Sequence, residues 1–595
     1  MPENPIVTLN HLYLRFRDGA IDRRQFLLRA SALGLSAASL SRFFSVLPAT
    51  AAEPVQSVTR TQWRRTLGQA FPFTEDPTAS RTGGTLKIGR SAAYPVTTLN
   101  LLLATDNPTQ TLLNACQEYL VGISPIDGQF VPGLADAWEI ASDGKTYTIH
   151  LNRDAHWHDG EPFTANDVVF SLRAQSDEST GTQFQASFVN AVESFRKLDS
   201  DTVELVATDV YAPVVFLGNT LTAILPKHIW GETPFKNWAT DPGSTGADPN
   251  RVVGTGPFRF VSVSGARDVF TFDRYADYYD DSPLVDSLEV HVLSDEAQTL
   301  KALKSGGIDV YERPPVDTLS SLLDDPDFDV TVYDTYGFIW YGSNLDAEKT
   351  PLFQDVNVRR ALMYGLDRKK MVKSIMRGFA EVAQGPQPLL SVAYDPDQIT
   401  TKYGYDPAHA KQLLRTAGWS DENGDGILEK NGAPFSFDVM YGEESSQVES
   451  AVKAMGDYWR RLGIVASPKP VSFSGEIVPA LFDTFDFQMV VLGFTWDATG
   501  DQSPMFGSAY KGVGFNAVGY SNPDYDRLAD EANRETDPDA RRELLIRAAN
   551  IVNGDLPVGI LWFRRDGAAS SARVHNFVPN GRSALWSLRW VWVDT

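Results

Sequence analysis

The residues best suited to binding a metal ion are the two histidines of the segment His156-Trp157-His158. On a strand, side chains two positions apart point to one face, as two imidazole ligands of a zinc ion require. The segment runs directly into Asp159-Gly160, a pair typical of a tight turn. The turn favours a structural role for both histidines, and we predict no metal site here.

A second oxygen-rich segment, residues 421–432, imitates a calcium-binding loop. Asp421, Asn423 and Asp425 occupy its first, third and fifth positions, and a glycine takes the sixth. The twelfth position of such a loop is a bidentate glutamate, whereas this chain has Gly432 there. Calcium binding stays an open alternative, and the residues favour a polar turn. We expect no cofactor.

The sequence lacks the motifs of common hydrolases. It has no Gly-x-Ser-x-Gly turn for a serine nucleophile and no His-Glu-x-x-His pair for a zinc protease. Its one cysteine, Cys116, cannot form an intramolecular disulfide and lies in an apolar stretch typical of a protein core. A secreted hydrolase is kept as the alternative from another functional class. It would need an activated nucleophile or a metal triad in a cleft.

Turns and helix caps mark where the elements that position these residues begin and end. Polar and apolar residues alternate through residues 146–151, the period of a half-buried strand. Asp143-Gly144 and Asp159-Gly160 predict turns on its two sides. Thr164 then predicts the N-cap of a helix.

Three further helix starts mark the C-terminal third. Asp406, Asn522 and Asp537 each stand directly before a proline, the arrangement of an N-cap followed by the first helical turn. Strand-like residues 487–492 alternate with these helices, so the fold class is α/β (mixed α+β). At 595 residues the chain is too long for one hydrophobic core, which predicts two or three lobes.

Two further predictions concern a helix and a linker. A long helix is expected to begin at Pro351 and to run past Met371. Residues 52–82 show neither helix nor strand pattern and are expected to form a linker.

Three stretches together resemble the family 5 extracellular solute-binding proteins, the dipeptide and oligopeptide receptors of ABC importers. They are the run from Gly133 to Leu172, the segment Gly254–Phe260, and the segment Pro351–Leu362. The resemblance covers residues 83–595. It implies a clamshell of the type II periplasmic-binding-protein kind, with two ligand-clasping lobes and an extra domain.

The resemblance also implies how the chain is divided. Lobes I and II would alternate along the first half, and lobe III would occupy most of the second. The expected segments are lobe I at 83–125, 225–335 and 556–595, lobe II at 126–224, and lobe III at 336–555, preceded by a leader at 1–51 and the linker at 52–82.

The ligand question rests on the loop Gly493–Phe506, which follows an apolar strand. In peptide receptors of this family, a loop of the type Gly-Trp-x-x-Asp-Tyr-x-x-Pro supplies an aspartate that pairs with the ammonium group of the peptide. Here Asp497 and Asp501 both fit by spacing, but the aromatic residue after the aspartate is missing. Either residue would serve equally well as the cap of a local turn. Trp496 is expected either to stack on the ligand or to fill the core between the lobes.

A second stretch, Tyr336–Asn344, resembles the strand by which the chain passes into lobe III. In the family, backbone groups in the cleft bind an extended peptide as an added strand. Trp340 and Tyr341 are adjacent on this strand and point to opposite faces, so at most one of them lines the cleft.

The first 51 residues resemble a twin-arginine signal peptide. Arg23-Arg24 precedes Phe26-Leu27, a weakly apolar stretch and a small-x-small site at Ala49–Ala51. The apolar stretch is too short to span a bilayer. We therefore expect export to the periplasm and a soluble protein after cleavage.

Charge narrows the set of partners. The chain has 53 basic and 76 acidic residues, a net charge of −23, which argues against nucleic acid and anionic membranes as partners. The resemblance implies a monomeric, non-enzymatic receptor that captures a small solute, expected to be a short peptide, and delivers it to an ABC permease in the inner membrane. A non-peptide solute, such as an opine, an oligosaccharide or a chelated metal, stays as an alternative.

Overall fold

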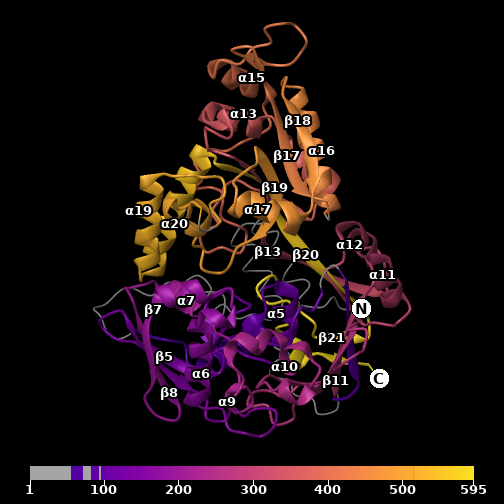
Figure 1. Ribbon diagram of the computed structural model, residues 1–595. Coiled ribbons are helices and arrows are strands. Elements are labelled where there is room, and N and C mark those ends of the chain that lie inside the picture. The colour runs from indigo at the N-terminus through magenta and orange to yellow at the C-terminus, as the bar shows by residue number, and fades with distance from the viewer. Residues whose placement is uncertain are drawn as a thin grey trace.

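The computed structural model describes residues 55–71, 82–92, 95–220, 222–443, 445–512 and 515–594. The expected leader, residues 1–51, lies outside the described residues. Figure 1 shows a lower part, made of the described residues within 55–327 and 572–594, and an upper part, made of those within 336–563. Both parts combine helices with sheets, which confirms the predicted mixed α/β class.

A five-stranded antiparallel sheet in the lower part is built around the alternating stretch. Its strands, in spatial order, are β1 (Val55–Gln56), β5 (Ala135–Ile140), β6 (Thr146–Leu151), β8 (Thr202–Ala207) and β7 (Val192–Lys197). Gly144 and Gly160 have φ angles of 69° and 91°, as the two predicted turns require. Thr164 caps α6 (Ala165–Ser176) through a capping box with Asp167, which confirms the predicted helix start.

A second, larger sheet runs through both parts of the molecule. Its strands, in spatial order, are β18 (Val465–Val471), β17 (Ser436–Gly442), β19 (Met489–Thr495), β13 (Phe328–Ser343), β20 (Val558–Ser571), β12 (Val310–Glu312), β2 (Thr85–Ser91), β11 (Ser287–Leu293), β10 (Val269–Arg274) and β9 (Phe258–Val263), and β14 (Ala380–Val382) also pairs with β20. The first four strands belong to the upper part and the last five to the lower part (Figure 1).

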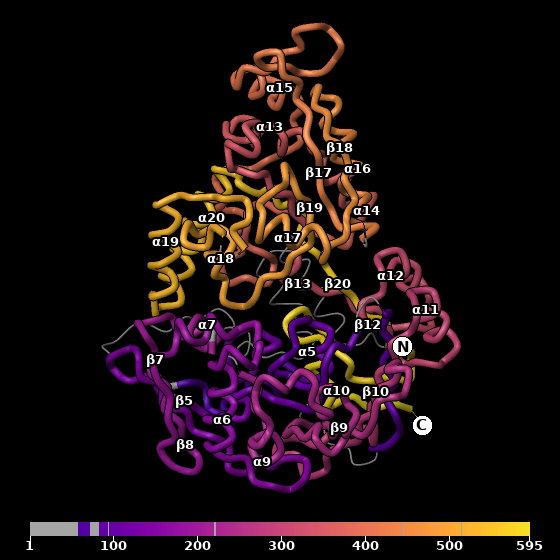
Figure 2. The backbone as a smooth tube through the Cα atoms, viewed as in Figure 1, coloured from indigo at the N-terminus to yellow at the C-terminus, as the bar shows by residue number. Residues whose placement is uncertain are grey.

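The two parts are joined covalently by β13 and β20 alone. The chain rises into the upper part along β13 and returns along β20, as the trace in Figure 2 shows. The two strands pair antiparallel over most of their length, with an irregularity in the middle. There Thr335 Oγ1 donates to Arg564 O at 3.0 Å and accepts the N–H group of Gly337 at 3.0 Å. These side-chain hydrogen bonds keep the ribbon closed where the ladder is interrupted.

The core of the upper part lies on both faces of its sheet. Side chains alternate along β13, so Ile339 and Tyr341 join one hydrophobic cluster, whereas Phe338 and Trp340 join the other. The surrounding helices are α13 (Val356–Tyr364), α14 (Arg368–Ile375), α15 (Pro407–Thr416), α16 (Ser446–Arg460), α17 (Val478–Phe482), α19 (Pro523–Arg534) and α20 (Pro538–Asp555).

The three helix starts predicted in this region are confirmed. Asp406, Asn522 and Asp537 each accept a backbone N–H group of the first turn, at 2.9, 2.9 and 2.8 Å. The prediction of one long helix from Pro351 past Met371 was wrong. The stretch forms α13 and then α14, because Asp367 accepts the N–H group of Lys370 at 3.0 Å and begins a new helix there.

Two adjacent arginines of α13 bind the carboxyl end of α20. Arg359 donates to the carbonyl oxygen of Asp555 at 2.7 Å, and Arg360 donates to that of Gly554 at 2.7 Å. The last carbonyl groups of a helix lack partners within the helix and carry its negative dipole end. Paired cations are therefore well placed there.

Residues 52–82, expected to lack regular structure, contain β1 and helix α4 (Arg60–Ala70). The expectation was wrong for residues 60–70, because this polar helix has no long apolar stripe that could reveal it. Its start carries a capping box between Thr59 and Gln62. The Ser57 N–H group donates to Trp138 O at 3.0 Å, which ties the segment to β5.

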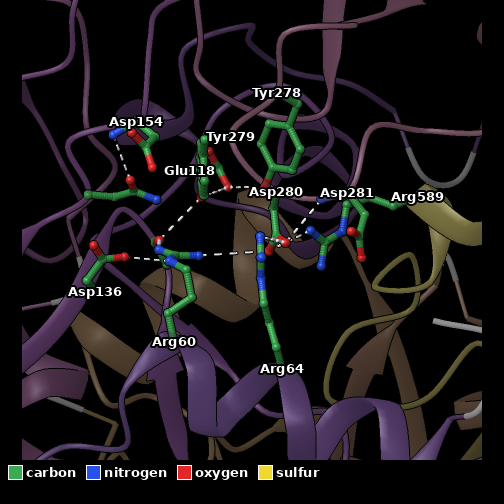
Figure 3. Close-up of polar contacts among 12 residues, drawn as sticks. Arg60, Arg64, Glu118, Asp136, Asp154, Tyr278, Tyr279, Asp280, Asp281 and Arg589 are labelled. Carbon is green, nitrogen blue, oxygen red and sulfur yellow. Dashed lines mark hydrogen bonds and ion pairs between the residues drawn. The ribbon is translucent and has the colours of Figure 1, made fainter. Parts of the chain in front are cut away.

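Arginines hold α4 against the lower part, as Figure 3 shows. Arg60 Nε lies 2.5 Å from Asp136 Oδ1, and Arg64 forms an ion pair with Asp280. Arg589, from the C-terminal segment, lies 2.9 Å from the same Asp280 carboxylate. Burial raises the pKa of Asp280, but the three arginines outweigh burial and lower that pKa to about 2.

A buried carboxyl group lies beside this network (Figure 3). Glu118 Oε1 accepts hydrogen bonds from the hydroxyl groups of Tyr278 and Tyr279, both at 2.8 Å. Burial raises the pKa of Glu118 and outweighs these two hydrogen bonds and the charge of Arg60, which lower it. The Arg60 guanidinium lies 5.0 Å from the centre of the Tyr279 ring. Helix α4 therefore covers a polar part of the interior.

We predict that Arg64→Gln lowers the free energy of unfolding by about 1 kcal/mol at pH 7, because Arg64 is half-exposed and its ion pair is only partly desolvated. The effect should fade as the pH falls toward 2, since the lowered pKa of Asp280 stabilises the fold only while that carboxylate is ionised. Urea unfolding at several pH values measures both. Arg65→Gln, on the exposed side of the same helix, is the control. Equal loss in the two variants would contradict the prediction.

Candidate functional site

Strand β19 leads into the loop Gly493–Phe506, and its two edges are covered unequally. Strand β13 pairs with residues 489–495 of β19, whereas β17 pairs only with residues 489–491. Among the described residues, the β17 side of β19 therefore has no strand partner beyond Val491. Gly493 and Thr495 lie on this stretch and are exposed.

The hydrogen bonds of the ladder show which backbone groups the open edge presents. The Asn344 N–H group donates to Gln488 O at 2.9 Å, and the Trp496 N–H group donates to Tyr336 O at 3.2 Å. In an antiparallel ladder, residues bonded to a given neighbour alternate with residues that face away from it. The even-numbered residues of β19 thus bond to β13. The N–H and C=O groups of residues 493 and 495 point to the open edge.

Strand β13 itself has no free edge in this region. Residues 337–343 pair with β19 on one side, and residues 338–342 pair with β20 on the other. Residues 338–342 of β13 therefore offer no edge to an added strand. Its neighbour β19 provides the free edge instead, because β17 turns away first.

Asp497 stands just beyond the open edge. Its Oδ1 accepts the N–H group of Thr499 at 2.8 Å and the hydroxyl group of Thr499 at 2.5 Å. The residue is exposed, yet burial by surrounding protein raises its pKa, helped by the charge of Asp501 and opposed by Thr499 and Arg541. Asp497 is thus open to solvent on one side and close enough to surrounding protein for its pKa to be raised.

Asp501 is more closely tied to its own loop. Its Oδ1 accepts the N–H group of Ser503 at 2.9 Å and the hydroxyl group of Ser503 at 2.5 Å, at the start of the short helix α18 (Ser503–Phe506). The Asp501 side chain is half-buried. Both candidate aspartates thus cap local turns, and Asp497 is the more accessible of the two.

The three aromatic candidates are all buried, and they lie on two different faces. Trp496 is 9% exposed and packs against Phe338 and Phe494, with ring centroids 6.0 and 5.1 Å apart. Trp340 lies in the same cluster, and the Nε1 atoms of both tryptophans lack a hydrogen-bond partner in the described part of the chain. Tyr341 is 1% exposed in the cluster on the opposite face, so a ligand has no access to it in this conformation.

A cation that the sequence did not single out lies near the loop. Tyr336, on β13, lies near Arg582 of the C-terminal segment, and both side chains approach Gly128. Burial raises the pKa of Tyr336, the contact with Arg582 lowers it, and the charges of Asp497 and Asp127 raise it again. Arg582 is far from these residues in the sequence, and no local pattern marks it.

The loop also touches the lower part. A Cβ atom at Gly218, in α8 (Pro213–Asn219), would lie only 2.9 Å from Thr499 Cγ2. Arg541 of α20 supports the loop from within the upper part by donating to Thr499 O at 2.6 Å. The loop is therefore held between α8 and α20.

The two parts meet again at the carboxyl end of α19. The Ala212 N–H group donates to Asn533 O at 2.8 Å across the boundary. Beside it, Arg534 Nη1 lies 2.9 Å from Asp209 Oδ2, and both side chains are about half exposed. In this conformation the upper and lower parts are closed on each other.

The histidine pair does not form a metal site. His156 is exposed, whereas His158 is buried and both of its ring nitrogens are engaged. The Gly254 N–H group donates to His158 Nδ1 at 3.3 Å, and Nε2 lies 2.8 Å from Gly256 O. This arrangement requires the neutral ring with its proton on Nε2. Burial lowers the pKa of His158 to about 4 and outweighs the bond to Gly256.

The calcium-like loop is the one group in the described part of the chain whose carboxylates could together hold a metal ion. Oxygens of Asp421, Asp425 and Glu429 lie within 4.8 Å of one another. Asp421 accepts the Gly424 N–H group at 2.7 Å, and Asp425 accepts the Ile427 N–H group at 2.8 Å, as in a polar turn. The loop follows α15, at the tip of the upper part and away from β13 (Figure 1).

A cavity of about 20 Å³ lies in the upper part beside Arg368. The Arg368 side chain is buried and donates to the carbonyl oxygens of Ala383 at 2.5 Å, Ile560 at 3.1 Å and Tyr403 at 2.7 Å. Such a volume accommodates one water molecule and not a solute.

Comparisons with known proteins agree on one family. The family model of the bacterial extracellular solute-binding proteins, family 5 (middle region), matches residues 129–517. The oligopeptide-binding protein AppA of Bacillus subtilis is 26% identical over 513 residues, 86% of this chain and 92% of that protein. Heme-binding protein A of Haemophilus influenzae is 27% identical over 510 residues, 81% of this chain and 87% of that protein.

A solved structure supports the same relationship. The structure of AppA from Bacillus subtilis in complex with a nonapeptide matches with a TM-score of 0.73 at 25% identity, covering 87% of this chain and 100% of that one. In the described residues, no helix combines the length and apolar character needed to cross a bilayer.

We predict that burial of neutral His158 makes the fold sensitive to acid. The pKa of His158 is about 4 in the folded state, below the ordinary histidine value near 6.5. Between these two pH values the unfolded chain binds a proton that the folded chain does not, so the free energy of unfolding is highest above pH 6.5 and decreases as the pH falls toward 4. Between pH 7 and 4 the wild type should lose up to about 3 kcal/mol more unfolding free energy than His158→Gln. Urea titrations measure this difference. His156→Gln, an exposed control, should behave like the wild type.

Proposed function

Because the chain belongs to the bacterial extracellular solute-binding proteins of family 5, we propose that it is the substrate-binding component of an ABC importer and captures short peptides. Members of this family are solute receptors rather than enzymes, and they act outside the cytoplasm. The peptide assignment follows the oligopeptide-binding relative and one feature of the site.

That feature is the open edge of β19. Gly493 and Thr495 direct two N–H donors and two C=O acceptors into exposed space, with Asp497 just beyond them. An extended peptide carries the complementary donors and acceptors at the same spacing, whatever its side chains are. The absence of a side chain at Gly493 allows a ligand backbone to approach closely.

Asp497 is the group we assign to the ammonium end of the peptide. Its pKa is raised because the surrounding protein desolvates the carboxylate, and a cationic ligand would relieve this penalty. Asp501 is the weaker candidate, since it is less exposed and already accepts two hydrogen bonds from Ser503. Trp496 and Trp340 are buried in the hydrophobic cluster next to β19 and would support the binding edge, and we assign Tyr341 no ligand contact.

Binding would be coupled to closure of the two parts. In this proposal lobe III, residues 336–555, swings about the β13–β20 ribbon against lobes I and II. The contacts of Ala212 with Asn533 and of Asp209 with Arg534 would form as it closes. The closed, monomeric receptor would then dock on its permease.

The N-terminal leader is consistent with export of the protein before it docks on the permease. We assign residues 1–51 to a twin-arginine signal peptide, which would deliver the protein to the periplasm. Replacing Arg23 and Arg24 together by lysine should stop periplasmic accumulation, because the receptor of this pathway reads the arginine pair and not its charge. Cell fractionation and immunoblotting measure the yield. Arg15→Lys with Arg17→Lys is the charge-matched control, and normal periplasmic yield of the Arg23/Arg24 variant would contradict this route.

Calorimetry with trialanine tests whether Asp497 is the amine anchor, the residue that binds the ammonium group of the peptide. Asp497→Asn keeps the shape of the side chain but removes its charge, which should weaken binding by about 2–5 kcal/mol. Asp501→Asn should change little. N-acetyl-trialanine, which has no ammonium group, should bind weakly to all three proteins. Affinity for trialanine should also fall on acidification at a higher pH than an ordinary aspartate would give, since the pKa of Asp497 is raised.

The outcomes separate the competing proposals. If both aspartate variants bind trialanine as tightly as the wild type, the amine anchor lies elsewhere. If the wild type binds no peptide, the solute is of another class, and native mass spectrometry of the periplasmic protein would identify it.

A further inference from the structure

An exposed aromatic side chain lies beside the open edge of β19. Phe515 is 49% exposed, and its ring centroid lies 5.2 Å from that of Phe494 and 5.9 Å from that of Phe482. Phe494 is half-buried and stands between Gly493 and Thr495 on β19. Water therefore reaches an apolar surface directly next to the backbone groups of the proposed peptide site.

The chain directly after Phe515 is held in place by the side chain of Asn516. Asn516 is fully buried, and its Nδ2 donates to Gly507 O at 2.9 Å and to Tyr520 O at 2.7 Å. Its Oδ1 accepts the Tyr520 N–H group at 2.9 Å. An aromatic ring on a fixed backbone presents a preformed surface at a small cost in conformational entropy.

Strand geometry determines which ligand residue meets this surface. A peptide whose ammonium group lies at Asp497 runs antiparallel to β19. Its first and third residues then exchange hydrogen bonds with Thr495 and Gly493. The second residue stands directly opposite Phe494, on the face of the sheet to which Phe494 points.

We propose that Phe494 and Phe515 form a subsite for an apolar, preferably aromatic, side chain at the second position of the peptide. The inference rests on the proposed function and goes further, since it adds a side-chain preference to recognition through the ligand backbone. A charged second residue would be rejected, because it would lose water against two aromatic rings without gaining a partner.

Calorimetry with four tripeptides tests the subsite: Ala-Ala-Ala, Ala-Phe-Ala, Phe-Ala-Ala and Ala-Asp-Ala. Ala-Phe-Ala should bind the wild type about 10- to 30-fold more tightly than Ala-Ala-Ala, as burial of an aromatic ring predicts. Phe-Ala-Ala should gain less than about threefold, and Ala-Asp-Ala should bind most weakly. In Phe515→Ala the advantage of Ala-Phe-Ala should fall below about fivefold. Tyr405→Ala, at a 43% exposed aromatic residue preceding α15, should keep the full advantage.

Three results would overturn the subsite: equal affinity for Ala-Phe-Ala and Ala-Ala-Ala, a greater gain from Phe-Ala-Ala, or an unchanged preference in Phe515→Ala. In each of these cases peptides still bind, so the proposed function stands. If none of the four peptides binds, the proposed function fails together with the subsite. Because the wild-type comparison uses no substituted protein, it is decisive even if the Phe515 variant unfolds.

Discussion

The antiparallel pairing of β13 with β20 is the interaction on which the rest of the structure depends. These strands carry the only covalent connections between the upper and lower parts, and they are also central strands of the larger sheet. Because β13 is hydrogen-bonded on both sides in the upper part, it is rigid there and fixes the position of β19. The open edge of β19 is thus placed at the boundary of the two parts by a sheet rather than by a loop. In the proposed closure, movement would fall to the ribbon near Thr335, where a side chain replaces part of the ladder.

Local chemistry explains which parts of the fold could be predicted from the sequence. Caps at Thr164, Asp406 and Asn522 are decided within one helical turn, so residue type and spacing suffice to predict them. Helix α4 was missed because it is held by ion pairs of Arg60 and Arg64 with residues distant in the sequence. Such partners leave no periodic pattern, and a polar helix without an apolar stripe looks like a linker.

The site was only partly predictable for a related reason. The sequence indicated the loop and two aspartates, but equal spacing could not separate Asp497 from Asp501. Their exposure separates them, and exposure depends on the packing of elements such as α8 and α20. The free edge could not be predicted either, because it results from β17 ending its contact with β19 at Val491. The register of β19 against β13, a strand distant in the sequence, decides whether the N–H and C=O groups of Gly493 point to β13 or to the open edge.

The half-exposed pair of Asp209 and Arg534 has a thermodynamic consequence for the molecule as a whole. This pair and the neighbouring backbone hydrogen bond from Ala212 join the two parts through residues that are not part of the open edge. In the proposed closure, these contacts would favour the closed form independently of any solute. Since mobile ions screen exposed charges, raising the ionic strength would weaken the Asp209–Arg534 pair and so favour the open form in the proposed motion. Apparent affinity falls when fewer molecules are in the binding-competent form, so salt would then weaken the retention of even an uncharged ligand.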